Sequence, residues 1–278
     1  MTDRYAIIGH PVAHSKSPEI HAAFARETGQ DLSYERVLAP LDAFPKAIAS
    51  WRDSGAAGAN VTVPFKLEAF AFATERTARA LRGGAVNTLK FDGEKIIGDN
   101  SDGVGLCRDI VDNLAFPIIG KRVLLVGAGG AARGVAGALL DAAPRLLCIT
   151  NRTLKKAELI VEELARGDAP HNLNALSLAA LPDAQFDLII NATSASLNNS
   201  LPLVPPKCFA DGCLAYDMMY GLAHTSFLLM AAGYGARAAD GLGMLVEQAA
   251  ESFFLWRGVR PKTAPVLAML RRPPGSGG

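Results

Sequence analysis

The chain has 278 residues, a formal net charge of +1 at pH 7 and hydrophobic side chains at 50% of its positions. This length accommodates two domains with separate cores, and a net charge so close to zero gives no reason to expect nucleic acid or an acidic membrane as a partner. The four cysteines lack C-x-x-C spacing, and no apolar run approaches the roughly 18 residues of a membrane helix. A reducing compartment without zinc sites or disulfides is therefore expected.

Two serines follow the first predicted strand, which covers residues 5–8. Pro18 favours the first position of a helix over 18–28 and makes Ser17 a good N-cap. A cap does not explain Ser15. In an extended segment Ser15 and Ser17 point the same way, and two hydroxyls at the carboxyl end of a strand suit a polyol ligand.

Lys66 occupies an unusual helix position. A strand is predicted over 59–63, and Pro64 then opens a helix, so that Lys66 falls in the first helical turn. The positive end of the helix dipole disfavours a cation there, and a lysine in such a field suits a general base. The alternative is a surface lysine whose flexible stem carries its charge into water.

A hairpin is predicted with strands over 85–91 and 95–98 around an Asp-Gly turn, and two polar residues, Asn87 and Asp102, lie in it or follow it. Asn87 lies in the first strand, where a polar amide is also compatible with a solvated face. Asp102 follows the second strand, and the local sequence favours the alternative that it caps a helix over 104–114.

Residues 123–140 read VLLVGAGGAARGVAGALL, which is a short apolar strand, a run of glycines and alanines, and an apolar helix. This order is typical of the turn that cradles a dinucleotide pyrophosphate, although an ordinary strand–helix turn is the alternative. Gly127 permits the tight turn, Gly129 lets backbone approach a phosphate, and Ala132 lets helix and strand pack closely. The helix N-terminus offers N–H groups to the anion.

The end of the next strand, over 146–150, predicts which dinucleotide binds. An acid about 20 residues after the glycines would bind a ribose 2′-hydroxyl and favour NAD. This chain has Asn151, Arg152 and Thr153 there. A guanidinium can stack on adenine and pair with a 2′-phosphate, and Lys156 adds charge nearby. We therefore predict NADP; the alternative is that Arg152 is only a surface cation.

The remaining elements continue the alternation of strands and helices. A last long helix is predicted over 240–256, in which Gln248 falls on a different edge from the core stripe and is also compatible with solvent. The other predicted helices cover 45–52, 68–82, 130–140, 154–166, 225–232 and 265–271, and the other strands cover 32–38, 187–190 and 214–218. Residues 273–278 are expected to form a flexible tail.

Nine short motifs come in one order along the chain. They are SKSP (15–18), NVTVPFK (60–66), GAVNT (84–88), GDNSDG (98–103), GAGGAARG (127–134), NRT (151–153), NATSAS (191–196), YDMMY (216–220) and DGLGMLVEQA (240–249). Together they resemble the shikimate dehydrogenase family from end to end.

This resemblance implies an α/β fold with two domains. An N-terminal three-layer substrate domain over 1–102, completed by helices of about 242–272, would join a Rossmann-type doubly wound NADP-binding domain over 103–241. The implied activity is reversible, NADPH-dependent reduction of 3-dehydroshikimate to shikimate, in chorismate and aromatic amino acid biosynthesis. The expected protein is a cytoplasmic monomer or homodimer with a small-molecule substrate and no metal, nucleic acid or membrane partner.

The resemblance also assigns roles to individual residues. Lys66 and Asp102 would form the acid–base pair at the reacting oxygen. The substrate would bind through Ser15, Ser17, Thr62, Lys66, Asn87, Asp102, Tyr220 and Gln248. The cofactor would bind through Gly127, Ala128, Gly129, Gly130, Ala131, Asn151, Arg152, Thr153, Lys156, Met218 and Gly241.

The chain departs from the family pattern at four places. Ser101 stands where threonine is commoner, and Ala78 where many members carry an acid. The loops at 197–199 and 221–223 also differ. Two other functions remain open: a quinate/shikimate dehydrogenase that prefers NAD, and a non-catalytic dinucleotide-binding sensor.

Overall fold

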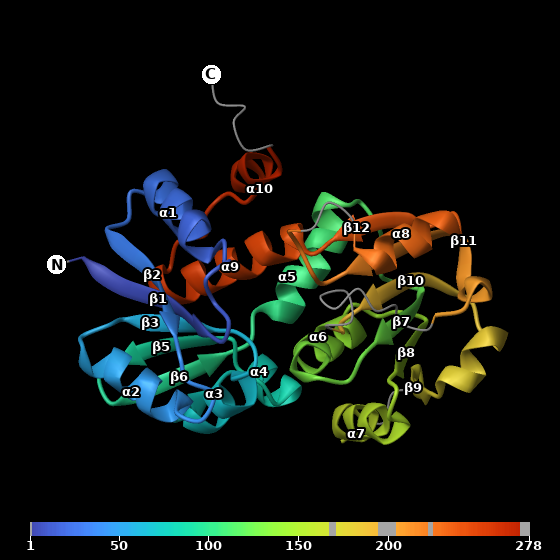
Figure 1. Ribbon diagram of the computed structural model, residues 1–278, viewed down its shortest axis with the longest axis horizontal. Coiled ribbons are helices and arrows are strands. Elements are labelled where there is room, and N and C mark those ends of the chain that lie inside the picture. The colour runs from blue at the N-terminus through green and yellow to red at the C-terminus, as the bar shows by residue number, and fades with distance from the viewer. Residues whose placement is uncertain (1, 167–170, 194–203, 222–224, 273–278) are drawn as a thin grey trace. The chain divides into compact units, whose positions relative to one another are not determined.

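The computed structural model describes residues 2–166, 171–193, 204–221 and 225–272, and it divides into two units (Figure 1). Unit 1 comprises Met1–Gly105 and Leu245–Gly278, and unit 2 comprises Leu106–Met244. Both passages of the chain between the units fall within helices, α5 (Asp102–Arg108) and α9 (Leu242–Arg257).

Unit 1 is built on a six-stranded sheet in the order β2-β1-β3-β5-β6-β4. β1 is parallel to β2 and β3, and β5 is antiparallel to both β3 and β6. The carboxyl ends of β1, β3 and β6 and the amino end of β5 therefore meet at one edge of the sheet. In sequence order the strands are β1 (Asp3–Gly9), β2 (Leu32–Leu38), β3 (Gly58–Val61), β4 (Glu75–Arg76), β5 (Thr88–Asp92) and β6 (Lys95–Asp99).

Helices cover both faces of this sheet (Figure 1). On one face, Ile20 and Phe24 of α1 pack with Phe253 of α9 and with α10. On the other, Ile48 of α2 shares a core with α3, α4 and the sheet. The predicted three-layer α/β arrangement is confirmed. The helices of this unit are α1 (Ser17–Thr28), α2 (Phe44–Asp53), α3 (Lys66–Phe72), α4 (Ala78–Gly83) and α10 (Ala264–Arg271).

Unit 2 contains a six-stranded sheet in the order β12-β11-β10-β7-β8-β9, in which every pair is parallel. The chain starts at the centre, winds outward on one side and then on the other, which is the doubly wound order of dinucleotide-binding folds. The predicted Rossmann-type architecture is confirmed. The strands are β7 (Arg122–Val126), β8 (Leu146–Thr150), β9 (Leu173–Leu176), β10 (Phe186–Asn191), β11 (Phe209–Asp217) and β12 (Arg237–Asp240).

The helices of unit 2 also lie on both faces of their sheet. Val135 of α6 and Ile160 of α7 belong to one core, and Phe227 of α8 belongs to the other. These helices are α6 (Gly130–Asp141), α7 (Leu154–Leu164) and α8 (Ser226–Gly233), with a π-helix η1 (Asp109–Asn113) and 3-10 helices η2 (Leu178–Asp183) and η4 (Pro206–Cys208).

Three local predictions in unit 1 are wrong. The helix after β3 begins at Lys66 instead of Pro64, and the predicted helix over 68–82 is interrupted by β4. The interruption arises because Thr74 exchanges hydrogen bonds of 2.8 and 2.9 Å with the backbone of Ile96, so sheet pairing overrides the helical pattern. Asn87 lies just before β5 and not within it.

The helix predicted over 104–114 is also different, because it starts at Asp102 and changes into the π-helix η1. The short strands β9 and β12 were not predicted. They are half exposed edge strands and lack the apolar run that marks a buried parallel strand. In the described part of the chain, no helix is long and apolar enough to cross a membrane.

Candidate active site

Lys66 and Asp102 form an ion pair at the edge of the unit 1 sheet. Lys66 is the first residue of α3 and Asp102 the first of α5, and each helix follows a strand that ends at this edge. Lys66 Nζ lies 2.5 Å from Asp102 Oδ2, with side-chain exposures of 14% and 7%. The carboxylate is thus engaged by the lysine, and the prediction that Asp102 only caps its helix is wrong.

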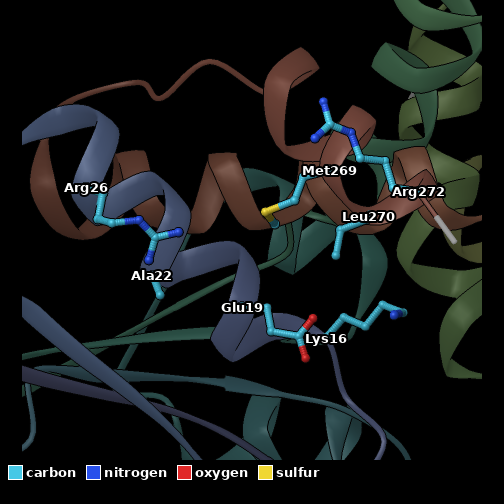
Figure 2. Close-up of a pocket in the computed structure, with 7 residues that line it drawn as sticks. All are labelled: Lys16, Glu19, Ala22, Arg26, Met269, Leu270 and Arg272. Carbon is cyan, nitrogen blue, oxygen red and sulfur yellow. The ribbon is translucent and has the colours of Figure 1, made fainter. Parts of the chain in front are cut away.

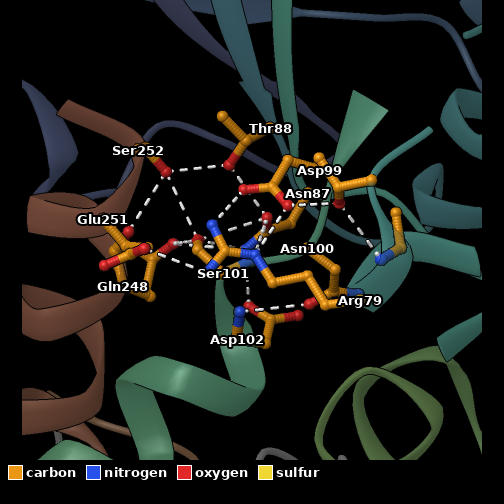
Figure 3. Close-up of polar contacts among 12 residues, drawn as sticks. Arg79, Asn87, Thr88, Asp99, Asn100, Ser101, Asp102, Gln248, Glu251 and Ser252 are labelled. Atoms are coloured by element: carbon orange, nitrogen blue, oxygen red, sulfur yellow. Dashed lines mark hydrogen bonds and ion pairs between the residues drawn. The ribbon is translucent and has the colours of Figure 1, made fainter. Parts of the chain in front are cut away.

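Asn87 connects this pair to its surroundings. Its Nδ2 donates to Asp102 Oδ1 at 2.8 Å and to Ser101 Oγ at 3.0 Å, and its Oδ1 accepts the N–H of Ser101 at 2.9 Å. Gln248 Oε1 lies 3.3 Å from both Asn87 Nδ2 and Ser101 Oγ (Figure 3). Four predicted residues, Lys66, Asn87, Asp102 and Gln248, therefore form one connected group within unit 1.

Ser15 and Ser17 converge as predicted, because their hydroxyls lie 3.1 Å apart. The prediction that Ser17 is the N-cap of α1 is wrong. Lys16 occupies the cap position without a side-chain cap, and the N–H of Ser17 donates to Ser15 Oγ at 3.3 Å. The hydroxyls follow β1, whereas Thr62 follows the neighbouring strand β3 and donates its N–H to Ile8 at 2.9 Å. All three residues thus lie at the edge that carries Lys66.

A second layer of polar residues supports Asn87 and was not predicted. Asn60 Nδ2 donates to Thr88 Oγ1 at 3.1 Å and to Ser252 Oγ at 2.9 Å. Thr88 Oγ1 in turn donates to Asn87 Oδ1 at 2.9 Å. One signal was available in the sequence: Ser252 lies four positions after Gln248 on the same predicted helix, so both side chains project from one face.

A buried histidine lies behind this layer. Tyr34 donates its hydroxyl to Asn60 Oδ1 at 2.8 Å, and the ring of His21 stacks on that of Tyr34 with centroids 4.3 Å apart. His21 is 0% exposed. Burial lowers the pKa of His21 to about 3, so the ring is neutral at physiological pH.

A surface hollow of about 480 Å³ also lies in unit 1, between α1 and α10 (Figure 2). None of the predicted site residues lines it. Its lining is Lys16, Glu19, Ala22, Arg26, Met269, Leu270 and Arg272. Among the described residues, no group of three or more histidine, cysteine or acidic side chains could hold a metal ion.

The glycine turn of unit 2 has the geometry that a bound pyrophosphate needs. Gly127 adopts φ +118°, and a Cβ there would lie 3.1 Å from Thr193 Cγ2 and 3.2 Å from the Ala192 backbone, so only glycine fits. A Cβ on Gly129 or Gly130 would meet nothing within 4 Å. The open side of these glycines leaves room for a ligand against the backbone.

The same turn leads directly into α6, which begins at Gly130 and has Gly129 as an N-cap without a side-chain hydrogen bond. The first N–H groups of the helix, including that of Ala131, have no intrahelical partners and form an anion site with the helix dipole. Ala128 and Ala132 are buried in the core below, at 7% and 0% exposure, as the close packing of helix and strand requires. The residues present fit a dinucleotide pyrophosphate.

Cationic side chains follow the neighbouring strand β8. Asn151 Nδ2 donates to the Thr153 carbonyl at 2.9 Å, and Thr153 is the N-cap of α7. Lys155 pairs with two glutamates of α7, at 3.1 and 3.5 Å. Arg152 and Lys156 are exposed and pair with no acid in the described part of the chain. These two cations fit the 2′-phosphate that distinguishes NADP from NAD.

Met218 and Gly241 lie together at the ends of β11 and β12, since a Cβ on Gly241 would overlap the Met218 carbonyl. The buried carboxylate of Asp217 organises this end of the sheet. It accepts the Met219 N–H at 3.1 Å and the Thr225 hydroxyl at 2.6 Å. Tyr220 follows in the same segment of unit 2 and is half buried.

Of the positions that depart from the family pattern, the structure describes Ser101 and Ala78 but little of the two loops. Ser101 is 0% exposed and keeps the hydroxyl that bonds Asn87. Ala78 opens α4, directly after its N-cap Thr77. The loop at 197–199, the end of the NATSAS motif and residues 222–223 lie outside the described residues, as does the predicted tail.

A doubly wound dinucleotide-binding unit and a second α/β unit with a lysine–carboxylate pair define the class of two-domain nicotinamide-dependent dehydrogenases. Three family models match the chain: the shikimate dehydrogenase substrate binding domain over 7–89, shikimate/quinate 5-dehydrogenase over 109–200 and the shikimate 5′-dehydrogenase C-terminal domain over 241–271. A relative from Methylobacillus flagellatus, named shikimate dehydrogenase (NADP(+)), is 58% identical over 97% of this chain and 99% of its own. The chain belongs to the shikimate dehydrogenase family.

Solved structures agree with this assignment. The Ael1 enzyme from Pseudomonas putida superposes with a TM-score of 0.91 at 45% identity and covers 98% of this chain and 99% of its own. The shikimate 5-dehydrogenase from Thermus thermophilus, in complex with NADP(H) and shikimate, superposes with a TM-score of 0.85 at 33% identity. It covers 98% of this chain and 99% of its own.

Proposed function

We propose that this chain catalyses the reversible reduction of 3-dehydroshikimate to shikimate with NADPH, in chorismate and aromatic amino acid biosynthesis. The observation that carries the proposal is the 2.5 Å pair of Lys66 and Asp102, at a sheet edge that also carries two converging serine hydroxyls. A cyclic polyol carboxylate offers the hydroxyls and the anionic group that such an edge can bind. In this proposal unit 1 binds the substrate and unit 2 binds the cofactor.

Lys66 and Asp102 supply the proton chemistry. Bound NADPH supplies the hydride, and reduction of a ketone leaves an alkoxide that needs a nearby cation and a proton. The ammonium of Lys66 provides both at the substrate oxygen. Asp102 holds this ammonium in place through their ion pair, and in the oxidation direction the pair receives the hydroxyl proton.

The remaining polar groups of unit 1 are proposed to position the ring of the substrate. Asn87 and Gln248 present amides next to the acid–base pair, where they can bind the neighbouring hydroxyl groups of the substrate. Ser15 and Ser17 are suited to the carboxylate, since hydroxyls donate to an anion without introducing charge. We further propose that Thr62 and Tyr220 complete the substrate site.

Unit 2 is proposed to bind NADPH through its backbone and its cations. The backbone at residues 127–131 would bind the pyrophosphate. The adenosine 2′-phosphate would be bound by the side chains that follow β8, which are Asn151, Arg152, Thr153 and Lys156. Met218 and Gly241 would flank the nicotinamide. The exposed cations Arg152 and Lys156 disfavour the NAD-preferring quinate/shikimate alternative, because NAD lacks the adenosine 2′-phosphate that would pair with them.

Initial rates in the oxidation direction test the proposal. The purified chain is mixed with shikimate or quinate and with NADP or NAD, and absorbance is followed at the nicotinamide band. We expect the highest kcat/KM with shikimate and NADP. A higher value with quinate or NAD would establish the alternative dehydrogenase, and the absence of any rate would favour a non-catalytic sensor.

We also propose that the protein works in the cytoplasm, because all four cysteines are unpaired thiols. The active form is proposed to be a monomer or a homodimer, because each chain carries residues for both ligands. Sedimentation velocity at assay concentration tests the oligomeric state, and a larger assembly would contradict it.

A further inference from the structure

Arg79 binds two buried carboxylates that come from distant parts of unit 1. Its Nε donates to Asp99 Oδ1 at 2.7 Å, and its Nη2 pairs with the other oxygen of the same carboxylate. Its Nη1 donates to Glu251 Oε1 at 2.9 Å. The carboxylate of Asp99 is 0% exposed and that of Glu251 is 9% exposed. Figure 3 draws Arg79 with Asp99 and Glu251, and dashed lines mark the contacts between them.

The contact with Asp99 leads to the acid–base pair. Asp99 is the last residue of β6, and Asp102 follows three positions later. The carbonyl of Asp99 accepts the N–H of Asn87 at 3.0 Å, and Asn87 in turn donates to Asp102 at 2.8 Å. Displacement of Asp99 would therefore move both the strand end and the amide that orient Asp102.

The contact with Glu251 leads to the substrate amide. Glu251 lies on α9, three positions after Gln248 and therefore one turn further along the same helix. Gln248 is the residue of α9 whose side chain reaches Asn87. A shift of α9 would move this amide relative to the acid–base pair.

Arginine suits this position better than lysine does. Its planar guanidinium can donate to both oxygens of Asp99 and still reach Glu251. The ammonium of a lysine is a compact charge and cannot form the same bidentate contact. Arg260 offers an internal comparison, because its Nη1 lies 2.8 Å from the second oxygen of Glu251. Arg260 has no contact with Asp99 among the described residues.

We propose that Arg79 is a positioning residue for the dehydrogenase reaction. Through Asp99 it orients Asp102 and so sets turnover, and through Glu251 it places Gln248 and so sets substrate affinity. This inference rests on the proposed function, because it assigns to Asp102 a role in proton transfer and to Gln248 a role in substrate binding.

Steady-state kinetics of four variants, with rates normalised to the folded fraction measured by near-UV circular dichroism, test the proposal. For Arg79→Lys we expect kcat to fall roughly 10-fold and KM for shikimate to rise several-fold, because a small displacement of catalytic groups is costly. Asp99→Asn should lower mainly kcat, and Glu251→Gln should raise mainly KM for shikimate. In every variant KM for NADP should stay within about twofold of the wild-type value, because the proposed cofactor residues lie in unit 2.

Arg260→Met is the matched control, because it removes a cation from the same glutamate but leaves Arg79 in place. It should keep the wild-type kcat and KM. Wild-type kinetics in Arg79→Lys would overturn the proposal, as would equal effects in Arg260→Met and Glu251→Gln. Neither result would affect the proposed function, which the oxidation of shikimate by the wild-type chain tests separately. If Arg79→Lys does not fold, the other two variants test the proposal. A lower kcat in Asp99→Asn together with a higher KM for shikimate in Glu251→Gln supports it, and the absence of this difference overturns it.

Discussion

The two candidate sites of this chain are built in opposite ways. In unit 1, charged and polar side chains bind one another, from Lys66 and Asp102 through Asn87 to the buried residues behind them. In unit 2, the site consists of backbone N–H groups, glycines with open space above them, and cations such as Arg152 that have no acidic partner among the described residues.

This difference follows from the ligands that the two sites are proposed to bind. A proton must be transferred at one atom, which requires side chains fixed in advance by neighbours. A dinucleotide brings its own negative charges, which pair with groups that the protein leaves unpaired. Substitutions in unit 1 should therefore affect turnover, whereas substitutions in unit 2 should affect the KM of the cofactor.

The largest effect is expected for Lys66→Ala. Turnover should fall by at least about 10²-fold, with little change in shikimate affinity, because the variant lacks the cation and the proton at the reacting oxygen. Steady-state kinetics and equilibrium binding of shikimate measure the two quantities. Lys95→Ala is the control, since Lys95 is an exposed lysine that pairs with Glu75. Near-normal turnover in Lys66→Ala would remove this lysine from the mechanism.

Asp102→Asn should have the next largest effect. The amide cannot form the ion pair that holds the ammonium of Lys66 in place, and it also alters the contact with Asn87. We expect turnover to fall by roughly 10-fold or more, together with a rise in KM for shikimate. A change confined to KM for NADP would contradict the assignment of this residue to the substrate side.

Arg152→Ala tests the open site of unit 2. Loss of a charge-assisted contact with the 2′-phosphate should raise KM for NADP by about 10-fold and leave kcat unchanged, and KM for NAD should rise much less because NAD lacks that phosphate. Lys155→Ala is the matched control, because that lysine is already paired with Glu158 and Glu162. Equal effects of both variants would mean that general surface charge, and not a phosphate contact, determines cofactor affinity.

The last expected effect is on stability and not on activity, and it comes from His21. Its pKa is about 3 in the folded protein and about 6.5 when unfolded, so between these values only the unfolded chain is protonated at this ring. The free energy of unfolding should thus fall by up to about 1.4 kcal/mol for each pH unit below 6.5, and above 6.5 this contribution is constant. His21→Phe should remove that slope, as measured by urea unfolding at several pH values. An unchanged slope would show that other groups cause it.

The sequence was most informative where one residue type explains one local geometry. Gly127, the serines Ser15 and Ser17, and the lysine in the first turn of α3 were all predicted from neighbouring residues. The second polar layer behind Asn87 and the contacts of Arg79 were not predicted, because their partners are far apart in the chain. Arg79 and Glu251 are separated by 172 positions, and no local pattern links them.

The same limit applies to Ser17 and Asp102, for which the local sequence also offers a capping role. Ser17 and Asp102 each stand at a helix start, where a capping residue is the simplest local explanation. Ser17 contacts Ser15, two positions away in the same loop, whereas the contact of Asp102 with Lys66 arises because two strands end at one sheet edge. For Asp102, the topology of the sheet and not helix propensity determines which partner the carboxylate has.

In the proposed reaction, hydride passes directly between the substrate ring and the nicotinamide while Lys66 and Asp102 transfer the proton. Shikimate deuterated at the carbon that becomes the ketone of 3-dehydroshikimate tests it, with NADP as the acceptor and nuclear magnetic resonance of the product as the readout. We expect the deuterium on the nicotinamide ring of the reduced cofactor. Deuterium released into water, with an unlabelled nicotinamide, would rule out direct hydride transfer.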